Sequence, residues 1–232
     1  ILSVAKHFPG HGDTAEDSHY TLPAVHHDRA RLDSVELLPF KRYIYDGYAG
    51  VMTGHLYVPA LDKARNKPVS MSRAVVTDLL QKELGFRGLC FTDALAMKGA
   101  TTRKSDNPSV MALLAGNDIL LAPAAPINDF AAVKEALEEG ILDREEIEAK
   151  IIKILQYKYI AGLNDYRPVE TKGLSERLNS PHAAWLAAKL NEEAITLLKN
   201  EGDIIPLKQL DKKKIAALSI GDGLSLIHIS EP

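Results

Sequence analysis

The chain has 232 residues, of which 46% are hydrophobic and 25% are charged, and its formal net charge is -3. This composition is typical of a globular protein and excludes disordered and collagen-like chains. The small net charge gives no basic field for nucleic acid, and no apolar run approaches the roughly 18 residues that a membrane-spanning helix needs. The single cysteine, Cys90, excludes an internal disulfide framework.

Four short apolar runs predict strands, in chain order at residues 3–7, 49–53, 89–92 and 118–121. Helical patterns separate these runs, and this alternation is typical of an α/β fold with a parallel sheet. Four strand-and-helix units are half of an eight-unit barrel, which typically needs about 250 residues. Residues 1–162 therefore predict either a small open sheet or one half of a barrel.

Helices are predicted between and after these strands. Ser72 can cap a helix that stops at Gly85, and two further helices are expected at 108–115 and at 128–139, the latter closed by Gly140. Asp143 and Glu146 match a capping box, before an amphipathic helix that ends near Gly162. The apolar faces of the first and last of these helices comprise Val75, Val76, Leu79 and Leu80, and Ile147, Ile151, Ile154 and Leu155.

The remaining residues are expected to begin a second α/β domain. Residues 163–180 lack periodicity and contain Pro and Gly, so they predict a linker. Ser180 and Pro181 suit the start of a helix that runs to about Asn200, and strands are expected at 204–207 and 214–220. The chain starts without Met and stops just after a new strand, so a piece of a longer protein is expected, whose targeting signal is not visible.

A histidine-rich loop follows the first strand. Five of the eight histidines lie within the first 27 residues, at positions 7, 11, 19, 26 and 27. A long loop of glycine and titratable residues beside a strand end is more often functional than structural. Gly10 and Gly12 leave the backbone free to bend, which suits a loop that closes over a substrate.

Three motifs carry a resemblance to a known family. They read Lys-His-Phe-Pro-Gly-His-Gly-Asp-Thr at 6–14 with Asp-Ser-His at 17–19, Val-Met-Thr-Gly-His at 51–55, and Phe-Thr-Asp-Ala-Leu-Ala-Met at 91–97. In this order they resemble the β-N-acetylglucosaminidases of glycoside hydrolase family 3, over roughly residues 3–220. The resemblance implies the C-terminal half of a TIM (β/α)8 barrel, followed by the start of an αβα-sandwich domain.

The resemblance also implies a division of the chain. The partial barrel is expected at 1–162, the linker at 163–180, and a linking helix with the start of the second domain at 181–223. Residues 224–232 do not continue the family pattern and are expected to be a non-native tail. A chain with only half of the barrel is expected to be inactive by itself.

The same resemblance implies the roles of the site residues. Asp93 matches the nucleophile of a retaining hydrolase, and it follows a strand, where barrel enzymes keep catalytic groups. His19 matches the general acid/base, with Asp17 bonded to its other ring nitrogen. The residues expected to contact the sugar or line its pocket are Lys6, His7, His11, His55 and Met97. His11 can instead organise the loop, and His7 and His55 can instead be structural.

Other readings of these residues remain open. His7, His11 and His19 could bind zinc in a barrel hydrolase, although no His-x-His motif occurs, so no metal and no cofactor are expected. A substrate-assisted mechanism needs an Asp-Glu pair, and Ala94 follows Asp93. A non-catalytic carbohydrate-binding relic is a third class. A β-glucosidase-type or phosphorolytic enzyme is the nearest alternative, and the carbohydrate partner, a muropeptide or a chito-oligosaccharide, is left open.

Overall fold

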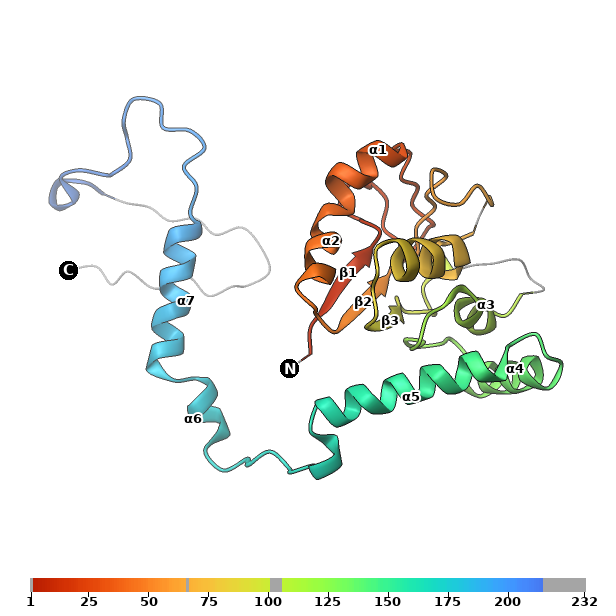
Figure 1. Cartoon of the computed structure of the whole chain (residues 1–232). Helices are drawn as coiled ribbons and strands as arrows, with labels where there is room; N and C mark the ends of the chain where they lie inside the picture. Colours follow the sequence, from red (N-terminus) through yellow and green to blue (C-terminus); the bar gives the residue numbers. More distant parts are fainter. Residues whose placement is uncertain (1, 66, 101–105, 215–232) are drawn as a thin grey trace. The chain divides into compact units, whose positions relative to one another are not determined.

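The computed structural model of the chain describes residues 2–65, 67–100 and 106–214 (Figure 1). The chain divides into two compact units, Ile1–Arg167 and Pro168–Pro232. The boundary between the two units falls within the segment expected to be a linker. No helix of the described residues is long and apolar enough to cross a membrane.

A parallel sheet forms the centre of the first unit. It contains β1 (Val4–Phe8), β2 (Gly50–Thr53) and β3 (Leu89–Thr92), in the order β1-β2-β3. The α/β fold with a parallel sheet is thus confirmed. Because the strands are parallel, the segments that follow them all begin at one edge of the sheet, where the candidate site residues lie.

The register between β1 and β2 shifts at one residue. Lys6 pairs with Met52 and Phe8 with Thr53, so His7 is an extra residue in β1. Such a bulge bends the strand and turns a side chain away from the regular alternation. His7 is thereby directed towards β3, whereas Phe8 remains fully buried.

The predicted fourth strand is wrong as a strand of the sheet. Residues 118–121 contribute only an isolated bridge, between Phe91 and Ile119. Next to this bridge, the Thr92 hydroxyl rather than a backbone carbonyl accepts the N–H of Leu121, at 2.9 Å.

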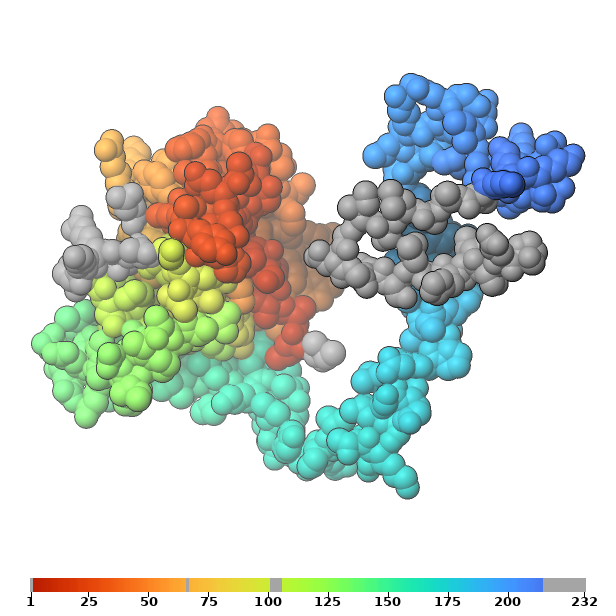
Figure 2. Space-filling model, turned by 180° about the vertical axis from the view of Figure 1, so that it is seen from behind, coloured from red at the N-terminus to blue at the C-terminus, as the bar shows by residue number. Residues whose placement is uncertain are grey.

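Helices surround the sheet, and some of them pack on it and bury its apolar side chains. In chain order the helices of the first unit up to Ile160 are α1 (Arg29–Arg31), the π-helix η1 (Leu32–Glu36), α2 (Leu38–Tyr45), the 3-10 turn η2 (Val69–Met71), the π-helix η3 (Ala74–Glu83), the 3-10 turn η4 (Lys98–Ala100), α3 (Pro108–Ala115), α4 (Pro126–Glu138) and α5 (Arg144–Ile160). The apolar residues of α4 pack with those of α3 in a separate cluster. Phe8 meets Phe40 of α2 edge-on, with the ring centroids 5.2 Å apart. Figure 2 shows the red and orange N-terminal segments beside the yellow-green segment around β3 on one face of this unit.

Most predicted helices of the first unit are confirmed, with corrections at their ends. The predicted apolar face of η3 is buried, and Gly85 ends this helix with φ +74°. Ser72 does not cap it, because its hydroxyl donates to Asp62 at 2.5 Å. Asp143 caps α5 by accepting the N–H of Glu145, but Glu146 forms an ion pair with Arg73 at 3.6 Å.

The apolar face expected on α5 is only partly covered. Ile147 and Ile154 are half-buried, whereas Ile151 and Leu155 are 51% and 56% exposed. The helix begins at Arg144 and ends at Ile160, two residues before Gly162, which has φ +79°.

The second unit differs more from the prediction. The expected linker contains the 3-10 turn η5 (Leu163–Asp165) and a short helix, α6 (Leu174–Leu178). Helix α7 (Pro181–Ala194) is capped by Ser180 as predicted, but it ends before Asn200 because Ile195 is extended.

No strand forms at residues 204–207. The Asn200 side chain instead bonds both backbone groups of Ile205, accepting its N–H at 3.0 Å and donating to its carbonyl at 2.8 Å. The 3-10 turn η6 (Leu210–Lys212) follows. Residues 215–220 of the other predicted strand, and the expected tail at 224–232, lie outside the described residues.

Candidate active site

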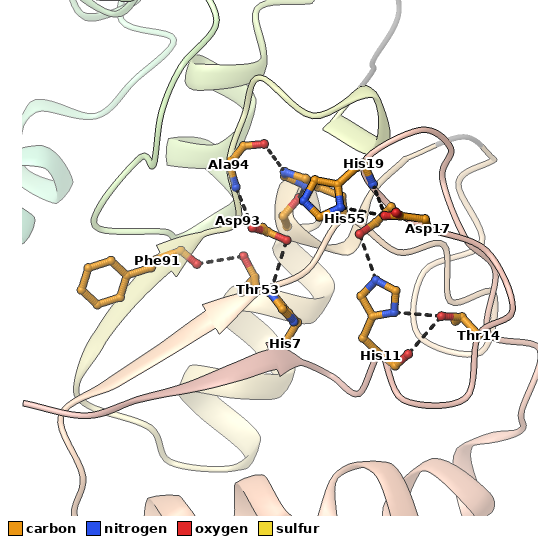
Figure 3. A network of polar contacts seen from close by, with 12 residues as sticks. His7, His11, Thr14, Asp17, His19, Thr53, His55, Phe91, Asp93 and Ala94 are labelled. Carbon is orange, nitrogen blue, oxygen red and sulfur yellow. Dashed lines mark hydrogen bonds and ion pairs between the residues drawn. The ribbon is translucent and has the colours of Figure 1, made fainter. Parts of the chain in front are cut away.

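The polar residues of the three motifs meet at the carboxyl edge of the sheet (Figure 3). The histidine-rich loop follows β1, His55 follows β2, and Asp93 follows β3. The convergence follows from the topology, because each motif comes directly after one of three neighbouring parallel strands.

Asp93 is the carboxylate at the centre of this edge. Its backbone N–H donates to the carbonyl of Thr53 at 2.9 Å, which ties it to the end of β2. Its Oδ1 accepts the N–H of Ala94 at 2.8 Å. Its Oδ2 lies 3.5 Å from Nε2 of His7, and the side chain is 13% exposed. One carboxylate oxygen is therefore held by the backbone, and the other faces His7.

His7 is half-buried beside Asp93. Burial lowers the pKa of His7, the neighbouring Lys6, His11 and His19 lower it further, and the Asp93 carboxylate opposes them. The lowered pKa favours the neutral form of His7, which can donate a hydrogen bond from Nε2 towards the Asp93 carboxylate without carrying a positive charge.

Asp17 and His19 form a pair within the loop. Oδ1 of Asp17 accepts both the backbone N–H of His19 at 2.9 Å and its Nδ1 at 2.7 Å. These two hydrogen bonds lower the pKa of Asp17, so it is an ionised acceptor. Nδ1 of His19 therefore carries a proton, and Nε2 is the ring nitrogen left to act. The two side chains are 57% and 69% exposed.

His11 has both ring nitrogens bonded inside the same loop. The Thr14 hydroxyl donates to the His11 carbonyl at 3.0 Å, so it accepts from Nδ1 at 2.8 Å. Nε2 then accepts from the Ser18 hydroxyl at 2.9 Å. These bonds match the loop-organising alternative for His11, and its contact with a sugar stays a prediction.

His55 is fully buried, with 0% exposure, under the turn that follows Asp93. Its Nδ1 lies 2.8 Å from the Ser70 hydroxyl, and its Nε2 lies 3.1 Å from the Ala94 carbonyl. This burial matches the structural alternative for His55, and its contact with a sugar stays a prediction.

Lys6 and Met97 lie on segments next to the cluster, in β1 and in the turn after β3. Met97 is half-buried in the turn after Asp93 and donates its N–H to Ala94 at 3.0 Å. Lys6 is exposed and lines a cavity of about 560 Å³ with His7, His11 and residues of η1 and α2. Asp93, Asp17 and His19 do not line this cavity, so it adjoins the cluster without containing it.

Among the described residues, one group could hold a metal ion, and it is not the three-histidine set. The ligand atoms of Asp13, His27 and Glu36 lie within 4.8 Å of one another. Arg31 stands beside them, 3.2 Å from Glu36 and 4.0 Å from Asp13. Its guanidinium already neutralises these carboxylates, which is unfavourable for a second cation.

Three buried polar residues near the site were not predicted from the sequence. Thr53, Ser70 and Asn117 are each 0% exposed. Asn117 donates to the carbonyls of Ser70 and Ala112 at 2.7 and 2.8 Å, and it accepts from the Thr53 hydroxyl at 2.9 Å. The only signal at Asn117 was the preceding Gly116, which indicates a helix end and no function.

Comparisons with known proteins agree with this arrangement. The family model described as the glycosyl hydrolase family 3 N-terminal domain matches residues 1–157. The chain is 34% identical to beta-hexosaminidase A of Pseudoalteromonas piscicida, over 96% of this chain and 40% of the relative. It is 26% identical to the beta-N-acetylglucosaminidase/beta-glucosidase of Cellulomonas fimi, over 98% of this chain and 42% of the relative.

Solved structures give the same result. A family 3 beta-N-acetylglucosaminidase of Paenibacillus sp. str. FPU-7 aligns with a TM-score of 0.79 and 35% identity, over 87% of this chain and 39% of that one. The beta-glucoside phosphorylase BglX aligns with a TM-score of 0.83 and 25% identity, over 89% of this chain and 39% of that one.

The parallel sheet, with polar residues on the loops after its strands, and the likeness to the family 3 structures place the domain in the class of barrel-type α/β domains. The chain belongs to glycoside hydrolase family 3. It spans about 40% of the length of the curated relatives named above.

Proposed function

We propose that the protein is a retaining β-N-acetylglucosaminidase, which removes terminal β-linked N-acetylglucosamine through a covalent intermediate on Asp93. The observation that carries this proposal is the pairing of Asp17 with His19 on the loop beside Asp93 (Figure 3). The names of the relatives support the substrate class, because several are beta-hexosaminidases.

The proposed first step breaks the glycosidic bond. Oδ2 of Asp93 attacks the anomeric carbon, and the leaving oxygen takes a proton from Nε2 of His19. The Asp17 carboxylate stabilises the doubly protonated ring before this transfer and holds the Nδ1 proton after it. His7, at 3.5 Å from Asp93, is placed to bond the attacking carboxylate or a sugar hydroxyl.

The second step regenerates the enzyme. Nε2 of His19 now accepts a proton from a water molecule, whose oxygen attacks the anomeric carbon from the leaving-group side. The bond between Asp93 and the sugar breaks, and the carboxylate is restored. Two displacements keep the configuration of the sugar, so the product is the β-anomer.

Covalent trapping tests this proposal directly. The protein, expressed from the complete reading frame that contains this chain, is treated with a slow fluorinated N-acetylglucosaminide, and its peptides are analysed by mass spectrometry. One sugar is expected on the peptide with Asp93, and Asp93→Ala should lower turnover by several orders of magnitude. A label on another residue, or no label in an active enzyme, would contradict the mechanism.

A phosphorolytic enzyme is the second candidate. It is favoured by the acid/base, because a neutral imidazole repels a phosphate acceptor less than a second carboxylate does, and by the likeness to a named phosphorylase. Product analysis separates the two reactions. In phosphate buffer, hydrolysis gives free N-acetylglucosamine, whereas phosphorolysis gives the sugar 1-phosphate.

A further inference from the structure

We propose that His55 is a positioning residue, which holds the Asp93 turn in place through a buried hydrogen-bond ring and, through Gly99 in the same turn, fixes where the Asp17–His19 loop lies. The inference rests on the proposed function, because it assigns these two segments to one reaction. The ring passes through Ala94, His55, Ser70, Asn117 and Thr53, and returns to Asp93.

The direction of each hydrogen bond follows from its chemistry. The Ala94 carbonyl can only accept, so Nε2 of His55 carries a proton and donates to it at 3.1 Å. Burial lowers the pKa of His55, so the ring is neutral and Nδ1 has no proton. The Ser70 hydroxyl must then donate to Nδ1 at 2.8 Å. This set of donors allows one tautomer of His55.

Asn117 fixes the other end of the ring. Its two Nδ2 protons go to Ser70 and Ala112, and its Oδ1 accepts from Thr53, so its amide is fully bonded. Thr53 is the last residue of β2, and its carbonyl accepts the N–H of Asp93. Asp93 is thus held on one side by β2 and on the other by the Ala94 backbone that His55 holds.

The segment after Ala94 also carries the catalytic loop. The N–H groups of Lys98 and Gly99 donate to the carbonyls of His19 and Ser18 at 3.4 and 3.2 Å. A Cβ atom on Gly99 would lie 2.7 Å from the Ser18 carbonyl oxygen and 3.1 Å from Cβ of His55. Gly99 therefore lies in close contact with His55 on one side and with the loop on the other. A displacement of His55 would consequently shift both Asp93 and the Asp17–His19 pair.

The test compares two substitutions of His55 in the protein expressed from its complete reading frame. His55→Gln retains an N–H near the Ala94 carbonyl, whereas His55→Leu has a similar volume without a donor. We expect His55→Leu to lower kcat by about 100-fold, since a misplacement near 1 Å costs this much. KM should change less than about threefold, and His55→Gln should recover at least about tenfold of the loss.

The leaving group separates this role from that of His19. A misplaced Asp93 slows the attack itself, so His55→Leu should slow activated aryl glycosides and poor leaving groups alike. His182→Leu, an exposed histidine of α7, is the matched control and should keep the original rates. If His55→Leu does not fold, Ser70→Ala replaces it, with an expected loss of about tenfold in kcat.

Nuclear magnetic resonance provides a readout that does not need activity. In ¹⁵N-histidine-labelled protein, His55 should be the Nε2–H tautomer and should titrate only below the ordinary histidine pKa of about 6.5. An Nδ1–H tautomer, or a folded His55→Leu with the original kcat, would overturn the proposal. An original protein that hydrolyses no glycoside would instead refute the proposed function, and the tautomer would still decide whether the ring exists.

Discussion

Burial gives two histidines of the same site opposite properties. His55 has 0% exposure and two fixed partners, whereas the His19 side chain is 69% exposed and has one free ring nitrogen. A buried histidine is kept neutral by the cost of desolvating its charged form. An exposed histidine beside an ionised carboxylate can take and release a proton, which general acid/base catalysis requires.

The lowered pKa of His55 predicts how stability depends on pH. The unfolded chain binds a proton at His55 as the pH falls through about 6.5, but the folded protein does so only at lower pH. The free energy of unfolding should therefore fall below about pH 6.5, by up to about 1.4 kcal/mol per pH unit, and level off below the folded-state pKa.

Urea denaturation at about pH 7.5 and pH 5.5 measures this slope. His55→Gln removes one titrating group, so its stability should depend less on pH than that of the original protein. His7 has a lowered pKa in both proteins, so it does not contribute to the difference. Equal slopes would show that His55 does not titrate differently on unfolding.

Substitution of His19 should depend on the leaving group. His19→Ala removes the proton donor, so glycosides with poor leaving groups should lose about 100-fold or more in kcat/KM, while activated aryl glycosides lose far less. Asp17→Asn should weaken the same step less and change the pH profile. Steady-state kinetics on a series of aryl glycosides checks this, and uniform losses would make His19 structural.

At the scale of elements, the turn after β3 links the two catalytic segments. Gly99 lies where the turn contacts the loop, and a Cβ atom there would lie 2.8 Å from the Thr21 carbonyl oxygen as well. Because both of these oxygens belong to the backbone, a side chain at position 99 could be accommodated only if the loop moved. The element that carries Asp93 therefore also determines where His19 lies.

Gly99→Ala should consequently reproduce part of the His19→Ala phenotype. The loop is displaced, so poor leaving groups should lose at least about tenfold in kcat, and the melting temperature should change by a few degrees. Gly12→Ala in the same loop is the control, because its Cβ would meet no atom within 4 Å. Kinetics that do not change in Gly99→Ala would show that the loop adapts.

The strands and the motif loops could be predicted because their signals are local. An apolar run followed by polar residues identifies a strand and its catalytic end, as at β3 and Asp93. At the predicted fourth strand the Thr92 hydroxyl replaces a backbone acceptor, and at Ile205 the Asn200 side chain bonds the backbone. These hydrogen bonds are tertiary contacts, and the spacing of apolar residues in the sequence does not indicate them.

The buried ring could not be predicted for a related reason. Asn117, Ser70 and Thr53 are up to 64 positions apart in sequence, and each alone resembles an ordinary turn or strand residue. What distinguishes them is that their side-chain polar atoms are bonded in the core, to one another and to neighbours such as His55 and Ala112. That property exists only once the three segments are packed together.

At the scale of the whole molecule, one buried ion pair ties α5 to the sheet. The Asp118 side chain is 0% exposed, and both of its oxygens lie 3.0 Å from Nζ of Lys153. Its Oδ2 also accepts the N–H of Cys90 in β3 at 2.8 Å. Because the exposed residues Ile151 and Leu155 add little burial, this pair carries much of the attachment of α5.

Loss of the lysine should destabilise the protein strongly. Lys153→Met leaves a buried carboxylate without its partner, which costs about 2–4 kcal/mol once partial exposure of the lysine is considered. Lys134→Met is the control, because Lys134 and its partner Glu138 are 68% and 65% exposed, and it should cost less than about 0.5 kcal/mol. Urea denaturation of both variants measures the difference, and similar losses would contradict the assigned role.

The hydrogen bonds between Asp17 and His19 close within three residues, one to the backbone and one to the ring. The pair therefore moves together with its loop, and neither of its hydrogen bonds involves a residue of the sheet. An insertion or deletion in the loop on either side of residues 17–19 would move the pair without breaking its two hydrogen bonds. Under the proposed function, such changes in loop length would alter which leaving groups the pair can reach, while the pair and Asp93 keep their own contacts.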